Sequence, residues 1–206
     1  TTGTVTNPVN MPSIPKEKLA EVEPFFALTE KLGKFLIQVT EGAVKELNIS
    51  YAGEVANYDV RPLTANAIKG LLSTNHGTHV NDVNARYLAE RIGMKINEHK
   101  TTTAKGFTNL VTVEVKTEKE THSVAGTLLN GLGARIVKVE GFVVDVKPDG
   151  NFLFIKNQDK PGSIGRVATK LAESQINIAT MQVGRDEVGG SAVMMLGIDN
   201  EVTAGD

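Results

Sequence analysis

A polar, turn-forming segment is the part of this sequence best suited to hold a small charged ligand. Residues 157–165 read NQDKPGSIG, and they lie between a strand-like stretch, NFLFIK, and a helix-like one, RVATKLAESQ. Pro161 and Gly162 set a turn that ends the strand and starts the helix, which leaves amide groups near Gly162 and Gly165 free to face a carboxylate. The pattern predicts a site for an anionic group at a helix N-terminus.

Three side chains near this turn supply the other groups that a zwitterionic amino acid needs. Asp159 offers an acceptor for an ammonium group, and Asn157 and Asn177 can each donate and accept hydrogen bonds. Together with the turn amides, they predict an amino-acid site. The same residue types also cap turns and shape the entry to a strand. From the residues alone, both interpretations stay open.

Other residues that could do chemistry lack suitable partners in the sequence. The segment HGTH, from His76 to His79, has a spacing at which two histidines can chelate a metal, but capping or solvated histidines fit it better. His99 and His122 stand alone, and no Ser, His and Asp arrangement can be argued. GLGARI at Gly131 fails the dinucleotide-binding pattern at its last position, and no phosphate-binding P-loop is present.

The composition narrows the class of protein. The 206 residues include 22 Lys and Arg against 24 Asp and Glu, so the chain has no basic excess for nucleic-acid binding. No cysteine is present, which removes disulfides, thiolate nucleophiles and Cys-ligated metals. No membrane-span or signal-peptide pattern is present either. We therefore expect a cytoplasmic globular protein with no nucleic-acid and no membrane partner.

The sequence pattern in the first part of the chain predicts helices with one strand among them. Residues 1–15 read as an extended arm, and 49–57, 63–75 and 84–93 read as a strand and two helices. A long helix is expected from about Pro15, because apolar residues recur at spacings of three and four. These are Leu28, Leu32, Phe35, Leu36, Val39, Ala43, Val44 and Leu47.

After Gly93 the pattern changes to strands. Four of them are expected, in NLVTVEVKT, SVAGTLL, RIVKVEG and FVVDVKP, and the turn PDGN at 148–151 marks a domain boundary. The remainder reads strand, helix, strand, strand, which is the opening of a ferredoxin-like βαββαβ fold. We therefore predict an α/β (α+β) protein with two domains. Because no fourth strand follows, we expect the last domain to be incomplete.

Longer stretches resemble known families. FLFIKNQDKPGSIGRVATKLAESQINIATMQVGR resembles an ACT domain, a small regulatory module that binds amino acids at its interfaces; the DKPG loop and the later INI carry the likeness. NMPSIP, EKLGKFLIQ, YAGEVANYDVRPLTANAIKGLL, VNDVNARYLAERIG and ARIVKVEGF resemble the region downstream of the catalytic core in long-form D-3-phosphoglycerate dehydrogenases. The resemblance covers nearly everything after residue 9.

The resemblance implies a division of the chain. Residues 1–32 would be an arm and linker from the catalytic part, 33–148 an intervening (allosteric substrate-binding) domain, and 150–206 an incomplete ACT domain. The catalytic and NAD-binding domains of such enzymes are expected outside these residues. We therefore expect no cofactor in this chain and no dehydrogenase activity from it alone; it would be the regulatory end of an enzyme in serine biosynthesis.

The resemblance also implies an effector site for L-serine, shared between two ACT domains of a homo-oligomer. The turn of one domain would supply Asn157, Asp159, Lys160, Gly162 and Ile164, and the other domain would supply Asn177. At Asn157 the family often has an aromatic residue or His, so this departure bears on the tightness of binding. Besides serine and a second copy, the expected partners are the catalytic domains of the full-length enzyme.

In the intervening domain, the resemblance implies binding of a phosphorylated substrate or another anion. Arg135, Lys138 and Lys147 lie on candidate strands near its end, and Arg86 lies in the first turn of a predicted helix. Arg135 and Lys147 are expected at strand ends, where side chains can converge on an anion. A solvated sheet face would contain the same residues.

Two other functions remain as alternatives. The regulatory part of an iron–sulfur L-serine dehydratase has a similar pair of domains, but it needs a catalytic chain or cluster cysteines, and this sequence contains no Cys. A purely structural module that holds an oligomer together would use the same turn residues. Only binding data separate that module from a sensor.

Overall fold

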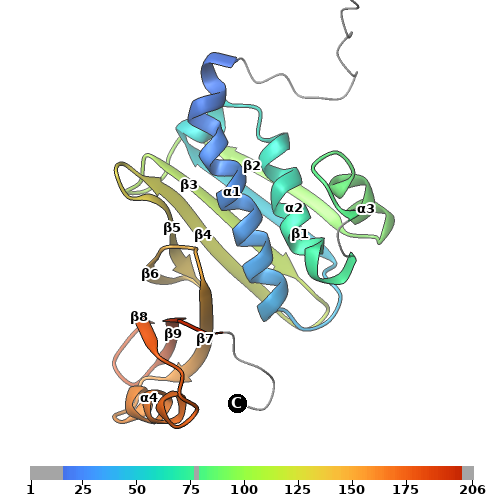
Figure 1. Cartoon of the computed structure of the whole chain (residues 1–206). Helices are drawn as coiled ribbons and strands as arrows, with labels where there is room; N and C mark the ends of the chain where they lie inside the picture. Colours follow the sequence, from blue (N-terminus) through green and yellow to red (C-terminus); the bar gives the residue numbers. More distant parts are fainter. Residues whose placement is uncertain (1–15, 77–78, 201–206) are drawn as a thin grey trace, which may run out of the picture.

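The computed structural model describes residues 16–76 and 79–200, and it confirms a mixed α/β chain with two domains. In the first domain, a sheet ordered β2-β1-β3-β4-β5-β6 is covered on one face by helices (Figure 1). Its elements are α1 (Lys16–Val39), β1 (Glu46–Gly53), a 3₁₀ turn (Glu54–Asn57), α2 (Arg61–His76), α3 (Ala85–Arg91), β2 (Lys95–Thr101), β3 (Asn109–Lys116), β4 (Thr121–Leu129), β5 (Gly133–Val139) and β6 (Phe142–Val146).

Helix α1 is shorter at its end than the apolar spacing predicts. It ends at Val39, and Gly42 has a φ of 86°, a conformation that glycine adopts without strain. Leu47 belongs to β1, where burial alternates along the strand. The spacing of three and four between apolar residues therefore continues by coincidence from the helix into the strand. The prediction of one helix through Leu47 was wrong at this point.

The start of α1 is part of the first domain. The helix runs without interruption across the expected boundary between residues 32 and 33, and Val22, Leu28 and Leu32 are fully buried in the core. The stretch from Val22 to Leu32 therefore packs as part of this domain. The predicted extended arm, residues 1–15, lies outside the described residues.

Strand β1 organises the sheet. It pairs antiparallel with β3, from Glu46 opposite Lys116 to Gly53 opposite Asn109, and parallel with β2 on its other side. Helices α2 and α3 form the crossover that a parallel pair requires. The sequence reading missed β2 because KINEHKT is polar and mostly exposed, as suits a strand at the sheet edge.

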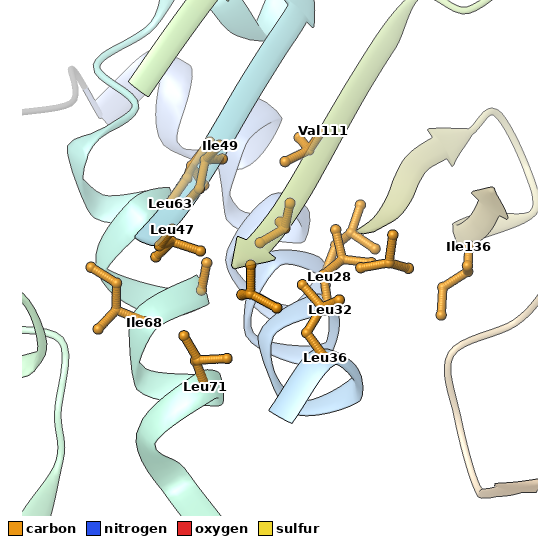
Figure 2. Packing of buried hydrophobic residues seen from close by; sticks show 14 of the residues in the cluster. Leu28, Leu32, Leu36, Leu47, Ile49, Leu63, Ile68, Leu71, Val111 and Ile136 are labelled. Atoms are coloured by element: carbon orange, nitrogen blue, oxygen red, sulfur yellow. The ribbon is translucent and has the colours of Figure 1, made fainter. Parts of the chain in front are cut away.

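The core lies between the sheet and helices α1 and α2. Figure 2 shows Leu28, Leu32 and Leu36 of α1 pointing toward the same region as side chains of β1 and α2. The phenol of Tyr51 is fully buried and lies 2.9 Å from the Thr64 hydroxyl of α2, so its polar atom has a partner. No helix among residues 16–76 and 79–200 is long and apolar enough to cross a membrane.

The second domain confirms the predicted strand, helix, strand, strand order. It consists of β7 (Asn151–Gln158), α4 (Ser163–Glu173), β8 (Ile178–Arg185) and β9 (Ser191–Ile198), with an antiparallel sheet ordered β7-β9-β8. Both faces of β9 are covered. Val193 and Met195 join the core of the first domain, whereas Met194 and Leu196 form a small cluster with Leu171 of α4.

The two domains contact each other through apolar and charged groups. The rings of Phe35 on α1 and Phe154 on β7 meet edge to face, with 5.5 Å between their centroids. Lys31 of α1 forms an ion pair with Asp149 in the connection before β7. The second domain is therefore docked on the first.

Candidate functional site

The turn between β7 and α4 lies where the sequence predicts it, directly before the first residue of the helix. Gly162 precedes the helix with a φ of 83°, and the Ser163 amide donates to the Lys160 carbonyl at 3.1 Å. The amides of Ile164 and Gly165 fall in the first turn of α4, where a helix offers no backbone acceptor. The Ile164 side chain beside them is 45% exposed. We call residues 157–165 the effector turn, after the role that the sequence resemblance predicts for them.

Asp159 has a partner that the sequence reading missed. Its Oδ2 atom lies 2.5 Å from Nη1 of Arg185, at the end of β8, and also accepts a bond from the Gly189 amide at 3.3 Å. The Arg185 guanidinium, with help from that amide, lowers the pKa of Asp159 below its usual 3.8. The carboxylate is therefore ionised at neutral pH, and an ammonium group would have to share it with Arg185.

This pairing gives a pH prediction. A lowered pKa means that the pair contributes its full stability above about pH 3.8 and loses it as the pH falls through the lower folded value. In an NMR titration of the side-chain carboxyl, we expect the Asp159 midpoint below 3.8 and a return toward 3.8 in Arg185→Gln. A wild-type midpoint at or above the usual value would contradict the pairing.

The two asparagines lie at different places on the second domain. Asn157 donates from Nδ2 to the Gln158 carbonyl at 2.8 Å, and its buried Oδ1 has no hydrogen-bond partner among the described residues. Asn177 precedes β8 and donates to Asp199 at 2.7 Å. Asp159, by contrast, lies at the far end of β8, about 25 Å away at the usual rise per strand residue. One copy of the chain does not bring Asp159 and Asn177 together.

The residues expected to hold an anion in the first domain each lie near a carboxylate or in solvent. Arg135, in the interior of β5 rather than at a strand end, has its Nε 3.6 Å from Asp145. Lys147 follows β6 and lies 3.1 Å from Asp149. Lys138 is exposed on β5, beyond a register shift that separates it from Ile136.

Arg86 on α3 is also occupied. It contacts Glu90 at 3.3 Å and Glu98 at 3.2 Å. A free anion would therefore compete with carboxylates that Arg86, Arg135 and Lys147 already contact.

The histidines divide into two kinds. The HGTH segment is only partly described, because residues 77 and 78 lie outside the described residues; His79 is exposed. Among residues 16–76 and 79–200, no three His, Cys, Asp or Glu side chains are grouped to hold a metal. His122, which the sequence reading left alone, is buried next to Glu120 and Glu140. Glu120 precedes it by two residues in the chain, whereas Glu140 reaches it only because β4 pairs with β5.

Comparisons with known proteins agree with this architecture. The model of the D-3-phosphoglycerate dehydrogenase intervening domain matches residues 21–140, and the ACT domain model matches residues 151–205. D-3-phosphoglycerate dehydrogenase of Methanocaldococcus jannaschii is 38% identical over 196 residues, covering 95% of this chain and 37% of the relative. The Bacillus subtilis enzyme of that name is 34% identical over 198 residues, covering 96% of this chain and 38% of the relative.

A plant relative matches in the same way. D-3-phosphoglycerate dehydrogenase 3, chloroplastic, of Arabidopsis thaliana is 32% identical over 210 residues, covering 94% of this chain and 36% of the relative. The chain thus spans a little over a third of the length of these curated relatives. The chain belongs to the D-3-phosphoglycerate dehydrogenase family, of which it comprises the intervening domain and an ACT domain, a regulatory region.

Proposed function

We propose that this regulatory region binds L-serine as a feedback effector, in a site formed by two ACT domains of a homo-oligomer. The observation that carries the proposal is the position of β8. This strand is an edge of the sheet, with Asn177 at its start and the Asp159–Arg185 pair at its end. Two copies related by a twofold axis perpendicular to the sheet, which sets their β8 strands side by side and antiparallel, would bring the effector turn of one copy next to Asn177 of the other.

The polar groups at the two ends of β8 suit a small zwitterion. The ionised Asp159 would take the ammonium group, and the amides of Ile164 and Gly165 at the start of α4 would face the carboxylate. Asn177 of the second copy would bond the remaining polar atoms of serine. Binding across the pair favours one arrangement of the oligomer, and linkage would pass that preference to the catalytic part of the enzyme.

Oxidation of 3-phosphoglycerate with NAD would belong to the remainder of the enzyme. The residues described here do not fit a dinucleotide. The GLGARI segment covers the turn between the antiparallel strands β4 and β5 and the first part of β5. Dinucleotide binding requires such a segment between a parallel strand and a helix. No step of hydride transfer is therefore assigned to these residues.

The test is a calorimetric titration of L-serine, with glycine, L-alanine and D-serine as controls. Asp159→Asn keeps the size of the side chain but removes its charge, and it should weaken binding roughly ten- to hundredfold. Asn177→Ala should weaken binding as well. Lys170→Gln, in the exposed last turn of α4 away from the effector turn, serves as a charge-removing control that should leave the affinity unchanged.

A mixture of the two weak variants tests whether the site is shared. Random pairing of Asp159→Asn with Asn177→Ala chains would give mixed dimers that contain one intact site each, so about a quarter of all sites should recover full affinity. Recovery is impossible if both residues act within one copy. The absence of serine binding by the wild-type chain would overturn the proposal and favour a purely structural module.

A further inference from the structure

Four ionisable side chains join the two domains beside the effector turn. We call Glu120, His122, Glu140 and Lys156 the interdomain cluster. His122 is only 4% exposed; its Nδ1 lies 3.2 Å from both carboxylate oxygens of Glu140, and its Nε2 lies 3.1 Å from Glu120. Lys156 reaches in from β7, with its Nζ 2.9 Å from Glu140 and 3.4 Å from His122 Nδ1. Within the cluster, the ACT domain contributes Lys156.

The position of Glu140, which contacts this lysine, is fixed by its backbone conformation and its hydrogen bonds. It has a φ of 53°, which is uncommon for a residue other than glycine and is kept only where the surroundings enforce it. Its backbone amide donates to the Ser123 carbonyl at 2.9 Å, and its side chain accepts from the Ser123 amide at 3.0 Å. The side chain of Glu140 is 14% exposed. Removal of Lys156 would leave a largely buried carboxylate with less compensating charge.

Two neighbouring rows of cross-strand residues in the ACT sheet, each with one residue from β7, β9 and β8, carry the domain contact and the residues beside the effector turn. Lys156, Val193 and Gly184 pair across the three strands. This row faces the first domain, since Val193 belongs to the larger core, and a Cβ on Gly184 would lie 2.8 Å from Cβ of Phe142 on β6.

The next row is Asn157, Ala192 and Arg185. Side chains of successive strand residues point to opposite faces, so this row faces away from the first domain. It carries Arg185, which holds Asp159 of the effector turn. One residue step along β7 and β8 therefore separates the ligand-binding groups from the groups that dock the domain.

We propose that the interdomain cluster is the coupling element of this regulatory region, with Lys156 as its positioning residue. In the structure, Lys156 is docked on Glu140 and Asp159 is paired with Arg185. An ammonium group that binds Asp159 competes with Arg185 for the carboxylate. This competition displaces the ends of β7 and β8, and the movement of β7 draws Lys156 away from Glu140. Effector binding and docking of the ACT domain thus oppose each other; this step rests on the proposed serine site.

Linkage gives the coupling a measurable sign. If docking opposes the effector, a variant that docks less tightly binds L-serine more tightly, because coupling between two equilibria is reciprocal. Lys156→Gln should therefore bind serine about fivefold or more tightly, the lower end of typical coupling. Lys156→Arg, which keeps the charge, should restore the wild-type affinity. Glu140→Gln, altered on the other side of the contact, should act in the same direction as Lys156→Gln.

Scanning calorimetry without ligand tests the docking separately. The wild-type chain should unfold in one transition, Lys156→Gln should show a separate, earlier transition of the ACT domain, and Lys156→Arg should behave as the wild type. Two transitions with unchanged serine affinity would make Lys156 merely structural and overturn the coupling. If the wild-type chain binds no serine, the proposed site fails, and a single transition in Lys156→Gln would then overturn the docking role too.

Discussion

Replacement of Gly33 by Ala should destabilise the first domain by about 3 kcal/mol, although alanine favours helices. A Cβ at Gly33 would fall on the carbonyl oxygen of Ala67 in α2 and lie 2.9 Å from the amide nitrogen of Leu71. Gly70 of α2 meets the backbone of Glu30 in the same way. Because the opposing atoms are backbone, no rotamer change can relieve the contact. Helices α1 and α2 would have to move apart over the core that they cover.

Urea denaturation of Gly33→Ala and Gly70→Ala measures this effect. Gly165→Ala is the matched control, because Gly165 also lies in a helix but has open space around its Cβ position. That control should stabilise the chain by up to about 1 kcal/mol. If Gly33→Ala is as stable as the wild type, the two helices cross at a greater distance than the structure shows.

Two adjacent methionines should give different patterns of instability when each is replaced by Ala. Met194 and Met195 are each 1% exposed, so either truncation should cost about 2–5 kcal/mol. Met194 faces the small cluster under α4, whereas Met195 packs in the core of the first domain. The first change should loosen the ACT domain alone, and the second should also loosen the docking between domains.

Hydrogen exchange distinguishes the two outcomes. Met194→Ala should lower the protection of α4 and leave α1 unaffected, and Met195→Ala should lower the protection of β7 and of the last turns of α1. The two residues are adjacent and chemically identical, so each serves as the control for the other. Identical exchange patterns would mean that the two faces of β9 do not pack against two separate hydrophobic clusters.

Local patterns in the sequence predicted much of the fold. The alternation in NLVTVEVKT and the helical spacing in α2 and α4 come from neighbours along the chain, and the structure has these elements where they were expected. Strand β2 has no such pattern. It lies at an edge with few buried side chains, and its position depends on pairing with β1 far earlier in the chain.

The site was predictable only as far as its own segment extends. The effector turn could be read from Pro161 and Gly162, because the turn and the helix start are local features. Its ion pair with Arg185 could not, since that contact depends on which strands lie side by side. The same is true of the contact between His122 and Glu140, which depends on the pairing of β4 with β5. The sequence shows Asp159 in the turn and Arg185 near the end of a predicted strand, but it does not show that the two side chains meet.

The antiparallel pairing of β1 with β3 has a consequence for synthesis of the chain on the ribosome. The residues that pair with β1 follow it by 56 to 70 positions, from Gly53 with Asn109 (109 − 53) to Glu46 with Lys116 (116 − 46). At about 5–20 residues per second, β1 waits several seconds for this partner. During that time its apolar side chains Leu47, Ile49 and Tyr51 can be shielded by α1 and by the newly made α2. We therefore expect the close crossing of these two helices to shield a nascent strand before its sheet is complete.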